Sequence, residues 1–155
     1  MGWFVVLLVV TALVRGMGAG IIYDSALVSP PLRRQIGVLA YAHYLRANLA
    51  GFGGKSYVTV AWAGMLLTFG ATLAAFLTHQ SAAVTWWTVG SLAATVVAFL
   101  GTGLALPTLL RVARKPDEPA EILAPALDHY ARWYAFSAVW QATAFAASVV
   151  ALAVR

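Results

Sequence analysis

The sequence predicts an all-α membrane protein: a four-transmembrane-helix bundle with an interfacial or extended helix before the second span. Two observations lead to this fold class. Hydrophobic residues make up 62% of the chain and charged residues only 10%, whereas a soluble domain usually carries about 25% charged residues. Four stretches are also apolar over roughly the 20 residues that a helix needs to cross a bilayer. We therefore expect residues 1–155 to form a single integral membrane domain.

The four predicted spans have recognisable ends. The first begins in an apolar run without a preceding basic segment, so we expect a permanent helix and not a cleaved signal. The third ends before Pro107, because proline disturbs the hydrogen bonds of a helix interior. Only residues 79–82 separate the second span from the third, which predicts an antiparallel hairpin. The spans cover approximately residues 3–23, 57–78, 83–106 and 131–154.

The connection 24–56 contains a predicted helix of its own. Ser29-Pro30-Pro31 is expected to end the first helix. Apolar residues then recur at helical spacing from Ile36 to Ala47, and glycines follow at positions 51, 53 and 54. This pattern predicts an amphipathic helix on the inner interface, or an extension of the second span hinged at the glycines. The connection 107–130 is rich in charge and proline, so we expect it to be exposed and mobile.

The basic residues predict the orientation in the membrane. In this topology the side of the two long connections carries eight basic residues, and the other side carries only Arg155. The positive-inside rule then predicts a multi-pass protein of the cell membrane with cytoplasmic connections and both termini outside. The net charge of +5 is assigned to these connections and not to nucleic-acid binding. The eight residues are Arg33, Arg34, Arg46, Lys55, Arg111, Arg114, Lys115 and Arg132.

The pattern His-Tyr-x-Arg occurs twice, at residues 43–46 and 129–132. Residues at i and i+3 share a helix face, so each copy places an imidazole beside a guanidinium. The topology puts both copies on the inner side of the membrane, together with all six tyrosines. A neutral imidazole can act as a general base, and a neighbouring arginine can stabilise the resulting anion. The candidate catalytic residues are therefore His43, His129, Arg46 and Arg132.

Two other interpretations of the histidines stay open. His43 and His129 could share a copper or iron ion, with Asp24, Asp128 or a tyrosine completing the ligand shell. Alternatively, these side chains only reach the lipid headgroups as part of an interfacial belt. The cofactor is accordingly unknown: either none, or a metal ion at the histidines. The chain has no cysteine, which excludes disulfides and thiolate-based sites.

Arg15 lies near the middle of the first span, where an unpaired charge is costly. Gln141 in the fourth span is its expected neighbour by depth. The pair is either a structural contact between helices or a clamp for an anion or carbonyl group inside the bundle.

The fourth span has two candidate faces. Trp133, Phe136 and Trp140 would form an aromatic wall that takes a flat, apolar molecule. Tyr130, Tyr134, Ser137 and Gln141 form a polar stripe, which a bundle normally packs inward, because lipid would leave it unsatisfied. The predicted substrate-binding residues are Arg15, Tyr44, Tyr130, Trp133, Tyr134, Trp140 and Gln141.

Several features together resemble a known family. They are the size, the four-span layout, the small residues from Gly16 to Gly20, the sequence Ser29-Pro30-Pro31-Leu32-Arg33, and His129 three residues before Arg132. Over most of its length the chain resembles the anthrone oxygenase-like family of small four-helix integral membrane proteins. The resemblance implies oxidation of a polycyclic aromatic anthrone to a quinone with dioxygen.

Two functions are expected from these observations. The first is a membrane-embedded oxidoreductase or oxygenase that acts on a small hydrophobic aromatic or quinone-like substrate at the inner mouth of the bundle. The alternative is a non-catalytic subunit, or a small-molecule-binding module, of a larger membrane complex. The expected partners are the lipid bilayer and a small hydrophobic molecule, with a homo-oligomer or a larger complex left open.

Overall fold

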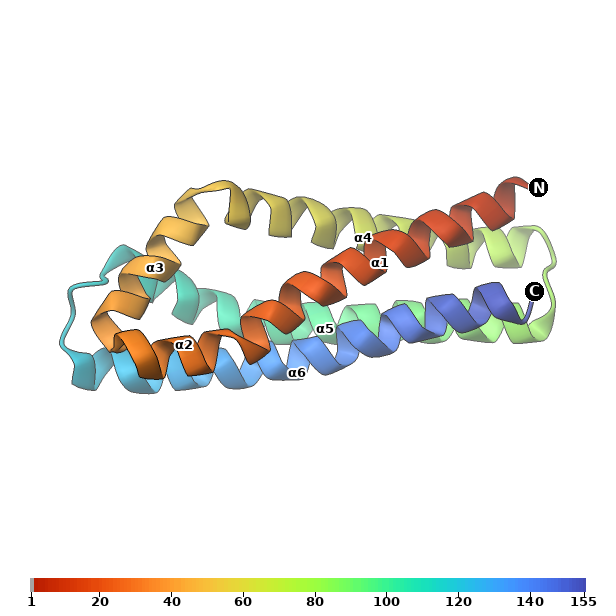
Figure 1. The fold of residues 1–155 in the computed structure, drawn as a ribbon. Helices are drawn as coiled ribbons and strands as arrows, with labels where there is room; N and C mark the ends of the chain where they lie inside the picture. Colours follow the sequence, from red (N-terminus) through yellow and green to blue (C-terminus); the bar gives the residue numbers. More distant parts are fainter. Residues whose placement is uncertain (1) are drawn as a thin grey trace.

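The computed structural model describes residues 2–155, which fold into six helices without a β-strand (Figure 1). The predicted all-α fold is confirmed. Four helical segments are long and apolar enough to cross a membrane: Trp3–Ile36, Gly53–Leu77, Ala82–Arg114 and Ala120–Ala153. The helices are α1 (Trp3–Leu27), α2 (Ser29–Ile36), α3 (Val38–Ala50), α4 (Phe52–Leu77), α5 (Ala82–Arg114) and α6 (Ala120–Ala153).

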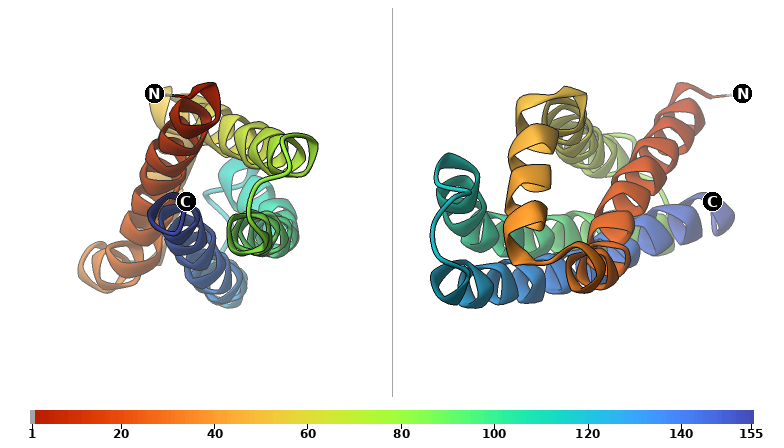
Figure 2. Two further views of the ribbon diagram at one scale, coloured as in Figure 1. Left: turned by 90° about the vertical axis from the view of Figure 1, so that its right-hand side faces the viewer. Right: turned by 60° about the vertical axis from the view of Figure 1, so that its left-hand side comes forward.

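The helices are arranged as the sequence predicts. Helices α4 and α5 form the expected hairpin, and their short turn lies at the same end of the bundle as both termini (Figure 1). Helices α5 and α6 run side by side for most of their length, and α1 crosses over α6 on its way to the other end (Figures 1 and 2). The end that holds α2, α3 and the α5–α6 loop also holds the eight basic residues named above; we call it the basic end.

The prolines at positions 30 and 31 begin a helix. Helix α1 ends at Leu27, just before them, but Val28 keeps helical angles (φ −86°, ψ −37°), so α2 continues almost directly from α1. Both prolines lie in the first turn of α2, where a missing N–H breaks no hydrogen bond. The chain changes direction at Gly37, whose φ of +85° is unfavourable for other residues.

The third and fourth spans are longer than predicted. Pro107 does not end the third span, because α5 continues past it to Arg114. Proline inside a helix removes one hydrogen bond and causes a kink, and α5 and α6 diverge toward their loop (Figure 1). Helix α6 begins at Ala120, well before residue 131, and continues through Pro125.

The predicted mobile connection 107–130 is mostly packed helix. Only residues 115–119 lie outside α5 and α6. Leu123 and Leu127 are buried in one cluster with Leu109 and Val112 of α5. This apolar packing extends the α5–α6 pair at the basic end, so His129 and Arg132 lie within α6 and not at its head.

The predicted extra helix is α3, which runs across the basic end from α2 to α4 (Figure 2). Tyr41, Ala42 and Leu45 are buried against α5 and α6. Helix α3 ends at Gly51, and α4 starts immediately after this glycine joint. A Cβ atom at Gly54 would lie 2.6 Å from the carbonyl oxygen of Leu49, so the tight joint requires a glycine there.

Candidate functional site

The first candidate site is a buried polar cluster around Arg15 of α1. Its Nε donates to Thr68 Oγ1 of α4 at 2.8 Å, and its Nη1 donates to Gln141 Oε1 of α6 at 3.1 Å. Its Nη2 donates to Thr95 Oγ1 of α5. Arg15 is only 2% exposed, and its three partners are buried as well. One arginine thus links all four spanning helices; we call these four residues the Arg15 cluster.

The two threonines are oriented to accept from the guanidinium. Thr68 donates its own proton to the carbonyl oxygen of Gly64 at 2.7 Å, and Thr95 donates to that of Ser91 at 2.7 Å. Each hydroxyl therefore presents lone pairs to Arg15. Gly64 allows this approach, because a Cβ atom there would lie 3.3 Å from Nη1.

The geometry of the Arg15 cluster favours a structural role. Gln141 is its partner, as depth along the spans predicts. Hydrogen bonds to neutral groups reduce the cost of a cation in the bilayer interior. Arg15 lines neither the cavity described below nor the smaller one beside Arg33 and Asp128. The clamp for a ligand anion or carbonyl, the other interpretation of the sequence, stays a prediction.

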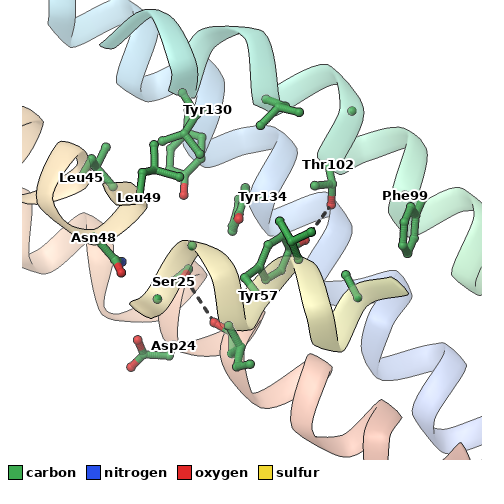
Figure 3. Close-up of a pocket in the computed structure, with 18 of the residues that line it drawn as sticks. Asp24, Ser25, Leu45, Asn48, Leu49, Tyr57, Phe99, Thr102, Tyr130 and Tyr134 are labelled. Atoms are coloured by element: carbon green, nitrogen blue, oxygen red, sulfur yellow. Dashed lines mark hydrogen bonds between the residues drawn. The ribbon is translucent and has the colours of Figure 1, made fainter. Parts of the chain in front are cut away.

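The second candidate site is a cavity of about 750 Å³ enclosed by α1, α3, α4, α5 and α6 (Figure 3). It lies toward the basic end, about two helical turns from the Arg15 cluster, since Thr102 and Tyr134 lie two turns from Thr95 and Gln141. Most of the lining is apolar. The polar or ionisable lining side chains are Asp24, Ser25, Tyr44, Asn48, Tyr57, Thr102, Tyr130 and Tyr134.

Tyrosines form one wall of this cavity. The ring of Tyr134 lies 4.6 Å from that of Tyr130 and 6.2 Å from that of Tyr57, between centroids. The hydroxyl of Tyr57 lies 3.3 Å from Thr102 Oγ1, a hydrogen bond between α4 and α5 (Figure 3). Tyr44 of α3 also lines the cavity. The structure thus brings together three of the predicted substrate-binding residues: Tyr44, Tyr130 and Tyr134.

The cavity reaches the outer surface of the bundle. Val58 and Trp62 of α4 line it, yet they are 54% and 57% exposed. Leu106 of α5 lines it as well and is 44% exposed. The ring of Trp62 packs edge-on against Phe99 of α5 with centroids 5.8 Å apart. Apolar and aromatic side chains therefore frame the cavity on the side of α4 and α5, whereas the exposed polar residues Asp24 and Asn48 line it on the side of α1 and α3.

The four predicted catalytic residues do not line the cavity. His43 is exposed, and its Nε2 lies 3.0 Å from Asp117 Oδ1 in the α5–α6 loop. His129 packs against Trp133 with ring centroids 6.3 Å apart. Arg46 and Arg132 are exposed, and Arg132 donates to the backbone of its own helix. Their catalytic role stays a prediction, without a shared cavity to support it.

The metal-binding hypothesis does not fit the arrangement of the side chains. Within residues 2–155, histidine, aspartate and glutamate form no group of three that could hold a metal ion. Asp128, one of the proposed ligands, instead pairs with Arg33 at 2.5 Å. His43 is paired with Asp117, as described above. We therefore assign no role to a copper or iron ion at these histidines.

The two predicted faces of α6 differ in burial. The polar stripe Tyr130, Tyr134, Ser137 and Gln141 is buried, as expected. This burial turns the neighbouring aromatic face away from the cavity. Trp133, Phe136 and Trp140 form a ladder with centroid distances of 5.7 and 6.2 Å, and Phe136 is 39% exposed. Trp133 and Trp140 thus do not line the cavity, contrary to the predicted aromatic wall.

The sequence interpretation missed several cavity residues. Tyr57 is one of the six tyrosines that the predicted topology places on the inner side, which is a signal for a shared site. The sequence predicts Asp24 as a candidate metal ligand and not as a residue that lines a cavity. The sequence contains no pattern that marks Asn48, Phe99 or Thr102 as cavity residues.

Comparison with known proteins gives no relative: the chain matches no protein-family model, no curated protein and no solved structure. The fold by itself defines the class of multi-pass helical membrane proteins, with four helices able to cross a bilayer. The resemblance to anthrone oxygenase-like proteins stays a prediction.

Proposed function

We propose that this protein binds a small, predominantly apolar molecule in the cavity between α1 and α3–α6. The observation that carries the proposal is the cavity itself, with a volume of about 750 Å³ and a mainly apolar lining. Binding sites for small molecules typically measure about 300–1,000 Å³ and combine an apolar lining with a few polar groups. The cavity meets both criteria.

The side chains favour a flat ring system. Tyr57, Tyr130 and Tyr134 lie on one side of the cavity, and Trp62 and Phe99 lie near its opening. Aromatic rings prefer stacked or edge-on contacts with other rings. Several hydroxyl groups among them can bond a polar substituent. These features support an aromatic or quinone-like ligand.

The opening supports uptake from the bilayer. Its frame is made of side chains that would otherwise contact lipid, including Val58 and Trp62. A ligand that dissolves in lipid could pass between α4 and α5 without crossing a polar surface. With the basic end on the cytoplasmic side, as the positive-inside rule predicts, the ligand would enter from the cytoplasmic leaflet.

An oxidoreductase or oxygenase that acts on the bound molecule is the second candidate function. Asp24 favours it, because this residue supplies the only carboxylate among the described residues that line the cavity. Removal of a proton from a bound aromatic compound needs a positioned base, and a carboxylate can fill that role. In this candidate Asp24 takes the place of the predicted histidine bases. Asp24→Asn would then abolish turnover of a bound substrate and leave its affinity within about threefold, a direct test of the two functions.

Two glycines of α5 provide a matched test of binding. A Cβ atom would meet nothing within 4 Å at either Gly103 or Gly90, but only Gly103 lines the cavity. Gly103→Leu should fill part of the cavity and weaken binding of 1-naphthol by at least about tenfold, a loss of ~1.4 kcal/mol. Gly90→Leu should leave the affinity unchanged.

The measurement is equilibrium binding to protein in phosphatidylcholine nanodiscs, corrected with protein-free nanodiscs. Saturable binding that Gly103→Leu weakens and Gly90→Leu does not would support the cavity as the site. Equal affinities in the two variants, or no saturable binding of naphthol and related aromatic compounds, would contradict the proposal.

A further inference from the structure

A short chain of hydroxyl groups lies behind the wall of the cavity. Tyr57 of α4 contacts Thr102 of α5, with 3.3 Å between the two hydroxyl oxygens. Thr102 lies 3.3 Å from Ser137 Oγ of α6 and 3.1 Å from the carbonyl oxygen of Ala98. Ser137 donates to the same carbonyl oxygen at 3.0 Å. The chain therefore connects the cavity to the carbonyl oxygen of the buried Ala98, and Figure 3 shows its first link, from Tyr57 to Thr102.

Either hydroxyl can be the donor between Tyr57 and Thr102, and counting protons favours one of the two directions. Each hydroxyl has one proton to donate. Ser137 uses its proton on Ala98, and Thr102 can use its own on Ala98 or on Ser137. Tyr57 then donates to Thr102, and every proton of the chain is used. If Thr102 instead donated to Tyr57, the tyrosine proton would have to find its acceptor in the cavity.

The preferred direction leaves the oxygen of Tyr57 as an acceptor on the cavity side. A ligand group that donates a hydrogen bond gains a partner there without disturbing the chain. A ligand group that only accepts must first turn the proton of Tyr57 away from Thr102, so it gains no additional bond. The neighbouring Tyr134 adds a hydroxyl beside Tyr57 that can donate to a ligand oxygen.

From this arrangement we infer that the group bound beside Tyr57 is a hydroxyl, so that the ligand is a hydroxylated apolar compound and not its ether or quinone counterpart. The inference rests on the proposed binding function and narrows the class of ligand. A hydroxyl group donates to Tyr57 and can accept from Tyr134, whereas an ether or carbonyl oxygen can only accept. One net hydrogen bond corresponds to a preference of about fivefold.

The test uses 1-naphthol and 1-methoxynaphthalene, which share the ring system but differ in the O–H donor. Affinities are measured with the full-length protein in phosphatidylcholine nanodiscs, corrected with protein-free nanodiscs. We expect wild-type protein to prefer naphthol by about fivefold. Because the extra methyl group also affects affinity, the decisive quantity is the change of this ratio between wild type and variants.

Three variants isolate the chain of hydroxyls. Thr102→Val removes the acceptor of the Tyr57 proton and keeps the side-chain shape. Tyr57 can then donate to the ligand, so the affinity for methoxynaphthalene should rise and the ratio should fall by about fivefold. Tyr57→Phe should lower the ratio without increasing the affinity for the ether. Thr143→Val is the control, because Thr143 is exposed and bonds only the backbone of its own helix.

The outcomes separate the two proposals. If both compounds bind saturably but Thr102→Val and Tyr57→Phe keep the wild-type ratio, the inferred hydroxyl preference is wrong and the binding function stands. If wild-type protein binds neither compound saturably, the binding function itself fails. Should Thr102→Val fail to fold, the ratio in Tyr57→Phe still decides the question.

Discussion

The Arg15 cluster and the cavity share the helices α1, α4, α5 and α6 and lie about two turns apart, but they use polar side chains differently. Around Arg15 each hydrogen bond of the guanidinium reaches a different helix. Toward the termini, other buried hydroxyl groups also form hydrogen bonds between helices. For example, Ser91 Oγ of α5 lies 2.8 Å from Ser148 Oγ of α6. At the cavity, polar groups such as Tyr134 and Asn48 instead face a space.

The comparison indicates a division of labour along the bundle. Interhelical hydrogen bonds and small residues hold helices together in a membrane, where the hydrophobic effect contributes little between them. The half of the bundle that contains the Arg15 cluster and the termini fixes the positions of α1, α4, α5 and α6. The other half can then keep a space between the same helices without losing the fold. Three predictions test this contrast, in order of decreasing effect.

The largest effect is expected from removing a partner of Arg15. Gln141→Leu deletes the acceptor of Nη1 and leaves a charged donor unpaired in an apolar interior. We expect the free energy of unfolding to fall by about 1.5–3 kcal/mol, the range for hydrogen bonds to charged groups. Unfolding in detergent measures it, and the double variant with Arg15→Met provides the control. If Gln141→Leu lowers the free energy of unfolding equally in wild-type protein and in the Arg15→Met background, the hydrogen bond between Arg15 and Gln141 is not the cause of the loss.

The second prediction compares two glycines of α5 that face opposite sides. A Cβ atom at Gly101 would lie 2.6 Å from Ser137 Oγ, whereas one at Gly103 would meet nothing within 4 Å. Gly101→Ala should therefore lower the free energy of unfolding by about 1–2 kcal/mol through overpacking against α6. Gly103→Ala should leave it unchanged or slightly higher, because alanine is the better helix former. Equal losses would show that α5 is packed on both sides.

The smallest effect is expected at the exposed histidines. Asp117→Asn removes the carboxylate beside His43, and we expect the loss of this exposed contact to change the free energy of unfolding by at most about 1 kcal/mol. His129→Gln should change 1-naphthol affinity less than about twofold, a difference of ~0.4 kcal/mol. Binding measurements and detergent unfolding check both values. A large loss of affinity in His129→Gln would return the histidines to the binding site.

The parts of the fold that depend on hydrophobicity and helical periodicity could be predicted from the sequence. These are the four spans, the hairpin at residues 79–82, the separate helix α3 and the burial of the polar stripe on α6. The Arg15–Gln141 contact could be predicted too, because depth along antiparallel spans restricts the partners of a buried charge.

The remaining features depend on packing that one segment alone does not encode. Pro30 and Pro31 suit the first turn of a helix as well as a break, and only the fold decides between these. Packing of Tyr130 and Tyr134 sets the rotation of α6, which turns His129 and Arg132 outward. The cavity unites residues of five helices, so its lining depends on their relative tilts.

Helix α3 acts as a spacer with one glycine joint at each end, Gly37 and Gly51. It contributes Tyr44, Leu45, Asn48 and Leu49 to the lining of the cavity. None of its residues takes part in the hydrogen bonds of the Arg15 cluster. Removing or adding one turn of α3 would therefore change the distance between α2 and the start of α4, and with it the size of the cavity. The hydrogen bonds of the Arg15 cluster would stay intact. The size of the cavity can thus be adjusted through the length of a single short segment.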